Sequence, residues 1–402
     1  MPSMGARQDS ASREEFTALT AFRGFAALLV VVFHYSGSFL PNLVFTDYTE
    51  FFEKGYLWVD FFFLLSGFVI SHAYGRKFVE GVRWEGFKQF AFARLARIYP
   101  LHAFVLLGFL LLELVRVPLY DAGYLHTQPF TKDMSPYLLG LNFAMLQTTA
   151  LADRLSWNGP AWSIGAEWVV YLVFPLLAVT LMRRGWRRFL VPLAVAAAGL
   201  VLISQGGRDL DVTYDFGLLR CLFEFLGGVM LYRLFTTGRM TVLRRDWVPL
   251  VILALLLGAM HLGLPDLLAP LLMAVLILAL AANTGRVGRA LSWRPFTWLG
   301  QISYSVYLSH MLVLQIVLTV SRVLLEHRLG RFLDPLQSVL ALLVFLGGIV
   351  ALSALLYRHV DCRVDRRFSA AASRGATSMA AAPRSAILHS DREVALSKGW
   401  PD

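Results

Sequence analysis

The stretch AFRGFAALLVVVFHYSG, residues 21–37, is apolar enough to enter a lipid bilayer, yet it contains Arg23 and His34. Charged and titratable side chains are expensive in hydrocarbon and are rarely kept there without a use. The two residues are eleven positions apart, about three turns of an α-helix or ~16 Å along its axis, so in a helix both side chains project from one face. Taken alone, Arg23 could be an anchor that snorkels to the membrane surface, and His34 could make a structural hydrogen bond between helices.

The composition of the whole chain predicts an integral membrane protein. Of its 402 residues, 57% are hydrophobic and only 16% are charged, whereas soluble domains carry about a quarter charged residues. Ten apolar segments are long enough to span a bilayer, at residues 17–39, 56–75, 98–117, 161–182, 188–204, 214–235, 247–263, 266–283, 296–321 and 336–357. An eleventh, 135–151, is short and is interrupted by Asn142 and Gln147, which indicates an interfacial helix. The predicted fold is an all-α polytopic bundle of about ten transmembrane helices.

Basic residues occupy every second connection between these segments. They are Arg76, Lys77, Arg83, Lys88, Arg94 and Arg97, then Arg183, Arg184, Arg187 and Arg188, then Arg233, Arg239, Arg244 and Arg245, and then Arg286, Arg289 and Arg294. The alternate connections carry acidic residues such as Asp121, Asp211 and Asp266. Cytoplasmic loops are enriched in Lys and Arg, so we expect the basic connections and both chain termini to be cytoplasmic. This explains the net charge of +10 without a nucleic-acid partner.

The same pattern divides the chain. We expect a cytoplasmic N-terminal segment over 1–16, a membrane domain over 17–367 with a long outside loop at 118–160, and a disordered cytoplasmic tail over 368–402. Cys221 and Cys362 give neither a disulfide framework nor a metal-ligand spacing, so no metal is expected.

Several polar side chains reach the outer part of the membrane in this orientation, near the level of the histidine in the first span. Asp60, Glu167 and His310 come from the second, fourth and ninth spans. Arg220 and Glu224 lie one turn apart in the sixth span and could simply neutralise each other. Polar groups at one level suggest a cavity inside the bundle, and the proton pathway of a transporter would look similar.

A second cluster lies at the cytoplasmic side, in FARLARIYPLH, residues 92–102. Arg94 and Arg97 are three positions apart on one helix face and could hold a phosphate group. They could equally be ordinary cytoplasmic charge, although Arg23 lies at the same membrane face and favours phosphate binding.

Six motifs, taken together, resemble acyltransferase family 3, whose integral membrane proteins O-acylate sugars, exopolysaccharides, lipids and some natural products. They are LTAFRGFAALLVVVFHYSG (19–37), WVDFFFLLSGFVISHAY (58–74), FARLARIYPLHAFVLL (92–107), WNGPAWSIGAEWVVYLVFPLL (157–177), LLRCLFEFLGGVMLYRL (218–234) and LGQISYSVYLSHMLVLQ (299–315). The resemblance implies ten core spans. It also implies transfer of an acyl group, usually acetyl, from cytoplasmic acyl-CoA to an acceptor at the far face.

The resemblance also implies roles for individual residues. His34 matches the essential histidine of the family and Arg23 the arginine paired with it. Arg94 and Arg97 match an arginine pair linked to donor binding, and Glu167 matches the acidic residue of a WS…E segment.

The expected mechanism uses these residues in order along the first span. The arginines would hold the CoA phosphates, and His34 would act as a general base on the acceptor hydroxyl or as a nucleophile that forms an acyl-imidazole. Either Glu167 or Asp60 could orient the imidazole. Four residues are candidates for the surrounding cavity: Asp60, Ser66, Arg220 and His310.

The chain departs from the family pattern in two places. The family often closes with a Glu-Lys-Pro element, where this chain has Asp361 and Cys362, and Glu167 is followed by Trp168 and Val169 instead of a second acidic residue and Gln. Some members carry an appended extracytoplasmic esterase-like domain that completes the transfer, so we expect this bundle either to act alone or to rely on a separate transfer partner.

The expected location is the bacterial inner membrane, and the expected acceptor is a glycan, glycolipid or natural product. Two other classes compete. A proton-coupled transporter or exporter should show broken helices or paired repeats. A structural membrane protein would not need the polar groups inside the bundle.

Overall fold

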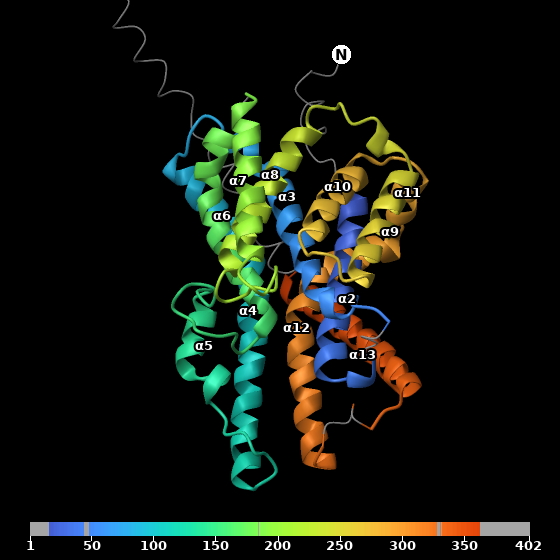
Figure 1. Cartoon of the computed structure of the whole chain (residues 1–402). Helices are drawn as coiled ribbons and strands as arrows, with labels where there is room; N and C mark the ends of the chain where they lie inside the picture. Colours follow the sequence, from blue (N-terminus) through green and yellow to red (C-terminus); the bar gives the residue numbers. More distant parts are fainter. Residues whose placement is uncertain (1–15, 44–47, 184, 328–329, 331, 362–402) are drawn as a thin grey trace, which may run out of the picture.

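The computed structural model describes residues 16–43, 48–183, 185–327, 330 and 332–361 (Figure 1). Every regular element in these ranges is helical. The main helices are α2 (Thr17–Ser38), α3 (Trp58–Phe78), α4 (Trp84–Asp121), α6 (Trp162–Leu181), α7 (Arg187–Ser204), α8 (Gly217–Phe235), α9 (Trp247–His261), α10 (Leu268–Ala282), α12 (Arg294–Leu325) and α13 (Pro335–Leu356). Two short helices are α5 (Pro136–Phe143) and α11 (Arg286–Leu291).

The helices bear out an all-α membrane protein. Within the described ranges, seven have the length and composition to cross a membrane: α2, α3, α4, α6, α7, α12 and α13. The other three predicted spans are also helices, but α9 and α10 have only 15 residues each, and α8 contains Arg220, Glu224 and Arg233. The number of spans, the position of the termini and the division of the chain stay predictions, and the segments 1–15 and 362–402 lie outside the described residues.

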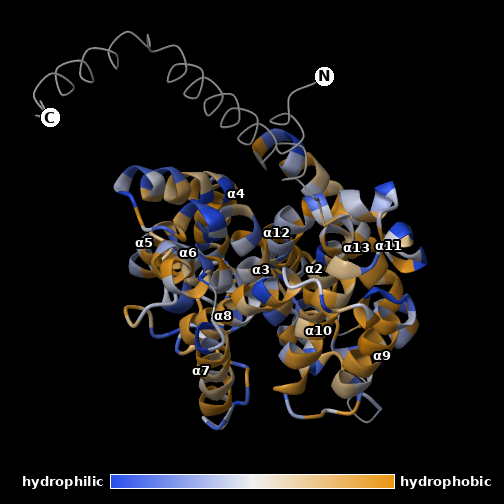
Figure 2. Cartoon of the chain, turned by 90° about the horizontal axis from the view of Figure 1, so that it is seen from above, coloured by the Kyte–Doolittle hydropathy of each residue, from blue (hydrophilic) through white to orange (hydrophobic). Residues whose placement is uncertain are grey.

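Apolar side chains cover the outside of the bundle. Seen from above, α2, α3 and α12 lie near the centre and α7 and α9 at the rim, where hydrophobic residues dominate (Figure 2). Leu190 and Val191 on α7, and Leu250 and Leu255 on α9, are exposed. A lipid-facing surface explains this, because lipid removes the cost of leaving large apolar side chains uncovered.

Helix α4 differs most from the sequence prediction, which places a span at 98–117. The observed helix begins at Trp84 and continues to Asp121, through Pro100 and Pro118. Its first part, FKQFAFARLAR, consists largely of residues with good helix propensity, and proline inside a membrane helix is tolerated where neighbours satisfy the backbone. The two arginines of this segment are therefore carried on the same continuous helix as the predicted span.

The predicted interfacial helix at 135–151 is shorter than expected. Helix α5 ends at Phe143, after which Met145 adopts a positive φ of 55°. Its start is set by Pro136 at the first helical position and by the Ser135 hydroxyl, which accepts a hydrogen bond from the Leu138 N–H at 3.4 Å.

Close contact between α2 and α12 sets the centre of the molecule. A Cβ atom on Gly300 of α12 would lie 1.8 Å from the carbonyl oxygen of Thr20 on α2. Only glycine allows the two backbones to approach this closely, as is common where membrane helices cross. The crossing brings residues of α12 beside the helix that carries Arg23 and His34.

Candidate active site

A pocket of about 180 Å³ lies between α2, α3, α4, α6 and α12. Five residues predicted from the sequence line it: Arg23, Ser66, Arg94, Arg97 and Glu167. They come from four helices that are separated in the chain. The sequence could predict only their depth in the membrane, and the fold places them in one pocket.

Three arginines gather at one part of this pocket. The Arg94 Nη2 atom donates a hydrogen bond to the Tyr74 hydroxyl at 3.1 Å, and the guanidinium lies 5.1 Å from the centre of the Tyr74 ring. The Arg94 Nε atom is buried and has no hydrogen-bond partner. Arg97 lies within electrostatic range of Arg23. Arginines that line one pocket, one of them with a buried and unpaired donor, indicate a site for an anion.

Glu167 is the acidic residue of the pocket. Ser66 and Tyr171 are hydrogen-bonding neighbours of its carboxyl group, and their own hydroxyl oxygens are 2.7 Å apart. Arg23 and Arg94 are its basic neighbours. The pocket lining holds three arginines and this one carboxyl, so it keeps an excess of positive charge even with Glu167 ionised.

The histidine of the first span lies beside the pocket but does not line it. His34 is half-buried, and its Nδ1 atom is 2.9 Å from the Val30 carbonyl oxygen and 3.3 Å from Nε2 of His310. The pocket ends near this pair, because Tyr307 lines it and its ring centre is 6.1 Å from that of His310. The prediction that His34 and His310 share one level is consistent with this contact.

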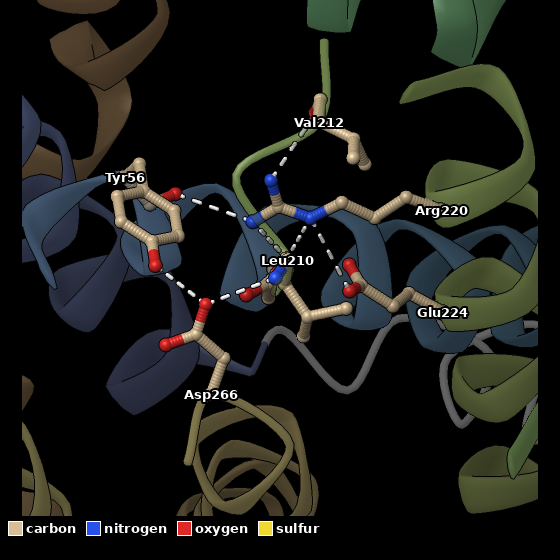
Figure 3. Close-up of polar contacts among 7 residues, drawn as sticks. Tyr56, Leu210, Val212, Arg220, Glu224 and Asp266 are labelled. Atoms are coloured by element: carbon tan, nitrogen blue, oxygen red, sulfur yellow. Dashed lines mark hydrogen bonds and ion pairs between the residues drawn. The ribbon is translucent and has the colours of Figure 1, made fainter. Parts of the chain in front are cut away.

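Asp60 and Arg220 are fully buried and belong to a separate network. Figure 3 shows Arg220 with Glu224, Tyr56 and Asp266 of this network. The Arg220 Nε and Nη2 atoms are 2.7 Å and 2.5 Å from Asp60 Oδ1, and Nε is 3.7 Å from Glu224 Oε1. Arg220 therefore pairs mainly with Asp60, and Glu224, which the sequence suggested as its neutralising partner, is more distant. Neither Asp60 nor Arg220 lines the pocket.

A third acid, Asp266, extends this network. It accepts hydrogen bonds from the Tyr56 hydroxyl at 2.5 Å and from the Leu210 N–H at 3.0 Å, and its other oxygen is 2.6 Å from Lys54 Nζ. Tyr56 also accepts a hydrogen bond from Arg220 through its backbone carbonyl, at 3.3 Å. The network ties α3, α8 and the start of α10 together.

The two acids expected to orient the imidazole have other partners in the structure. Asp60 is bound to Arg220, and Glu167 is bound by Ser66 and Tyr171. Within the described part of the chain, neither carboxyl contacts His34, whose imidazole instead meets the buried His310.

Three tyrosines of the site were missed from the sequence. Tyr171 follows Glu167 by one turn and Tyr307 precedes His310 by three positions, so helix periodicity could have found both. Tyr74 meets Arg94 across two helices, and no local pattern predicts that contact. Across the described residues, His, Cys, Asp and Glu side chains form no group of three or more suited to a metal ion.

Comparison with known proteins identifies the family. A model described as an acyltransferase domain, that of acyltransferase family 3, matches residues 16–358. The chain belongs to acyltransferase family 3. It is therefore an acyltransferase, and the transporter and structural alternatives fall away.

Three relatives illustrate the range of this family. "Protein 2 in picA locus" of Rhizobium radiobacter is 33% identical over 206 residues, 48% of this chain and 95% of that protein. Acyltransferase MdmB of Streptomyces mycarofaciens is 28% identical over 326 residues, 74% of this chain and 79% of the relative. A candidate peptidoglycan O-acetyltransferase, YrhL of Bacillus subtilis (strain 168), is 24% identical over 319 residues, 73% of this chain but 47% of that longer protein. No solved structure matches the chain.

Proposed function

We propose that this acyltransferase moves an acyl group from cytoplasmic acyl-CoA to a hydroxyl group of a carbohydrate-type acceptor, and that the acyl group is acetyl. The observation that carries the proposal is a pocket lined by three arginines from α2 and α4, one of which, Arg94, has a buried Nε atom without a hydrogen-bond partner. Planar guanidinium groups suit phosphate oxygens, which they bind by charge-assisted hydrogen bonds. CoA carries its phosphates at one end and its thioester at the other, and this matches an arginine-rich pocket with a histidine beside its far part.

The pocket arranges the donor along α2. Arg23, Arg94 and Arg97 hold the phosphates, and the acyl end extends past Tyr307 toward His34. The separation of ~16 Å between Arg23 and His34 along the helix is within the reach of the pantetheine arm. Ser66, Tyr171 and Glu167 line the path between these ends.

His34 then acts as general base on the acceptor. The acceptor O–H bond breaks, its proton passes to His34, and the oxygen attacks the thioester carbonyl carbon. The C–S bond breaks next, and the departing CoA sulfur takes the proton, which restores neutral His34. Formation of an acyl-imidazole on His34 is the competing route, and it would be detected as a labelled protein after donor is added without acceptor.

Acceptor and location belong to the same proposal. The peptidoglycan named for the YrhL relative supports a carbohydrate hydroxyl as acceptor, and a natural product or glycolipid offers the same nucleophile. We place the enzyme in a bacterial inner membrane with ten spans, both termini cytoplasmic and the acceptor at the far face. An extracytoplasmic partner protein could complete the transfer.

The test uses purified protein in lipid nanodiscs, acetyl-CoA labelled on the acetyl group and glycan fragments as acceptor, with release of the CoA thiol and base-labile label on the acceptor as readouts. We expect His34→Ala to abolish transfer while the protein still inserts into membranes. Arg94→Gln should raise the donor KM by about tenfold or more, because a hydrogen bond to a charged group contributes about 1.5–3 kcal/mol.

The control is Arg83→Gln, which removes an exposed arginine eleven residues earlier in the chain and outside the pocket. It should leave both kcat and the donor KM unchanged. Thiol release by His34→Ala at the wild-type rate would overturn the proposed mechanism. Equal changes of the donor KM in Arg94→Gln and Arg83→Gln would contradict the assignment of the pocket as the donor site.

A further inference from the structure

Two histidines from helices far apart in the chain meet inside the bundle. His34 lies on α2 and His310 on α12, their ring centres are 5.0 Å apart, and Nδ1 of His34 is 3.3 Å from Nε2 of His310. His310 is fully buried. The Tyr35 hydroxyl donates a hydrogen bond to the His310 backbone carbonyl at 3.1 Å, which holds the two helices in register at this level.

The backbone around the pair determines where the protons lie. Nδ1 of His34 is 2.9 Å from the Val30 carbonyl oxygen, and Nδ1 of His310 is 3.3 Å from that of Val306. A carbonyl oxygen only accepts, so each Nδ1 must carry the hydrogen. A neutral imidazole has a single N–H, and both Nε2 atoms are therefore bare.

This arrangement gives the two Nε2 atoms different roles. Nε2 of His310 faces the N–H of His34 and can accept a share of its hydrogen bond. Nε2 of His34 makes no hydrogen bond with any residue that the structure describes, so its lone pair is available. The reactive nitrogen of the pair is thus the one on the half-buried histidine.

We propose that His310 is the positioning residue of His34: it accepts the Nδ1–H hydrogen bond of His34, fixes the tautomer with a bare Nε2, and stabilises the imidazolium formed when Nε2 takes the acceptor proton. This inference rests on the proposed function. In hydrolase triads a carboxylate orients the histidine, whereas here the two candidate acids, Asp60 and Glu167, have other partners. No proton is lost or gained in this role, because the one taken up by His34 leaves with the CoA sulfur.

The first experiment reads the tautomer directly in the unmodified enzyme. With ¹⁵N-labelled histidine in nanodiscs, the imidazole nitrogen shifts distinguish a protonated Nδ1 from a protonated Nε2, and the signal missing from His34→Ala assigns His34. We expect His34 to be protonated at Nδ1. A resting His34 protonated at Nε2 would overturn the proposal without reference to any activity.

The second experiment compares three variants on α12 in the acetyl-CoA assay. His310→Phe keeps the ring volume but removes the acceptor, and we expect kcat to fall by about a hundredfold with an unchanged donor KM. His310→Gln keeps an acceptor oxygen on a side chain of similar reach and should recover kcat to within about tenfold of wild type. Ser309→Ala is the matched control. Ser309 precedes His310 in the same turn of α12, and the substitution removes its buried contact with Ser353, 3.4 Å away.

The outcomes distinguish a failure of this inference from a failure of the proposed function. If His34→Ala is inactive while His310→Phe keeps the wild-type kcat, His310 does not position His34 and the inference alone fails. If His310→Gln is as inactive as His310→Phe, or if Ser309→Ala is equally impaired, the effect is structural and the inference also fails. If wild type and His34→Ala release thiol at the same rate, the proposed function itself fails.

Discussion

At the residue scale, the molecule separates two kinds of buried charge. Arg23, Arg94 and Arg97 line a pocket and have only Glu167 as an acidic counterpart there. Arg220, by contrast, is enclosed with Asp60 at 2.5 Å and is fully buried. Arginines that line a pocket, one of them with a buried Nε atom that has no hydrogen-bond partner, indicate ligand binding, whereas an arginine paired inside the protein indicates a structural role.

We predict that Arg220→Met destabilises the protein by about 3–5 kcal/mol, because it leaves the buried carboxylates of Asp60 and Glu224 without their cation. Unfolding in nanodiscs or mild detergent, followed by circular dichroism, measures this. Arg208→Gln is the control, since it breaks an ion pair with Asp215 in which the arginine is 53% exposed, and it should change stability by less than about 1 kcal/mol. Similar losses in the two variants would contradict a structural role for the network.

The sequence could predict these residues but not their partners. Charged and titratable side chains are costly in hydrocarbon, so their presence in apolar segments identifies candidate residues without any knowledge of the fold. These are Arg23, His34, Asp60 and Arg220. Their pairing depends on which helices touch, and Asp60 and Arg220 are 160 positions apart. Glu224 was the natural guess because it is one turn away, and tertiary contact overrode that local neighbour.

At the element scale, the crossing of α2 and α12 carries the site. The two helices bring His34 and His310 together only if their backbones touch near Thr20 and Gly300. Apolar length predicted the existence of both helices, but the crossing depends on small residues, Gly24 and Gly300, whose partners cannot be read from local periodicity. The start of α4 was also missed, since hydropathy detects the apolar 98–117 and not the amphipathic turns before it.

We therefore predict that Gly300→Ala lowers the free energy of unfolding by about 1–3 kcal/mol, through overpacking against the Thr20 carbonyl. Acyl transfer should fall as well, because separation of the helices lengthens the contact between the histidines. Gly347→Ala on α13 is the matched control: its new Cβ has no atom within 4 Å, and alanine is favoured over glycine inside a helix by about 1 kcal/mol. Equal stability of the two variants would refute the close crossing.

At the scale of the whole molecule, charge and shape agree on an orientation. The connections that follow α3, α6, α8 and α10 all lie at the upper end of the molecule (Figure 1). They contain basic residues including Arg83, Arg183, Arg239 and Arg286, whereas α4 ends at Asp121 at the lower end (Figure 1). By the positive-inside rule we propose that the upper end lies in the cytoplasm, on the side where the proposed acyl-CoA donor is available.

Cysteine labelling in intact cells tests this orientation. In a background with Cys221 and Cys362 replaced by alanine, Thr127→Cys lies in the predicted outside loop and Thr237→Cys in the basic connection after α8, and both positions are exposed. A membrane-impermeant maleimide should label Thr127→Cys in intact spheroplasts and Thr237→Cys only after the membrane is opened, because the reagent cannot cross hydrocarbon. The reverse pattern would place the arginine-rich part of the pocket away from cytoplasmic acyl-CoA, and a donor from the other side would then be required.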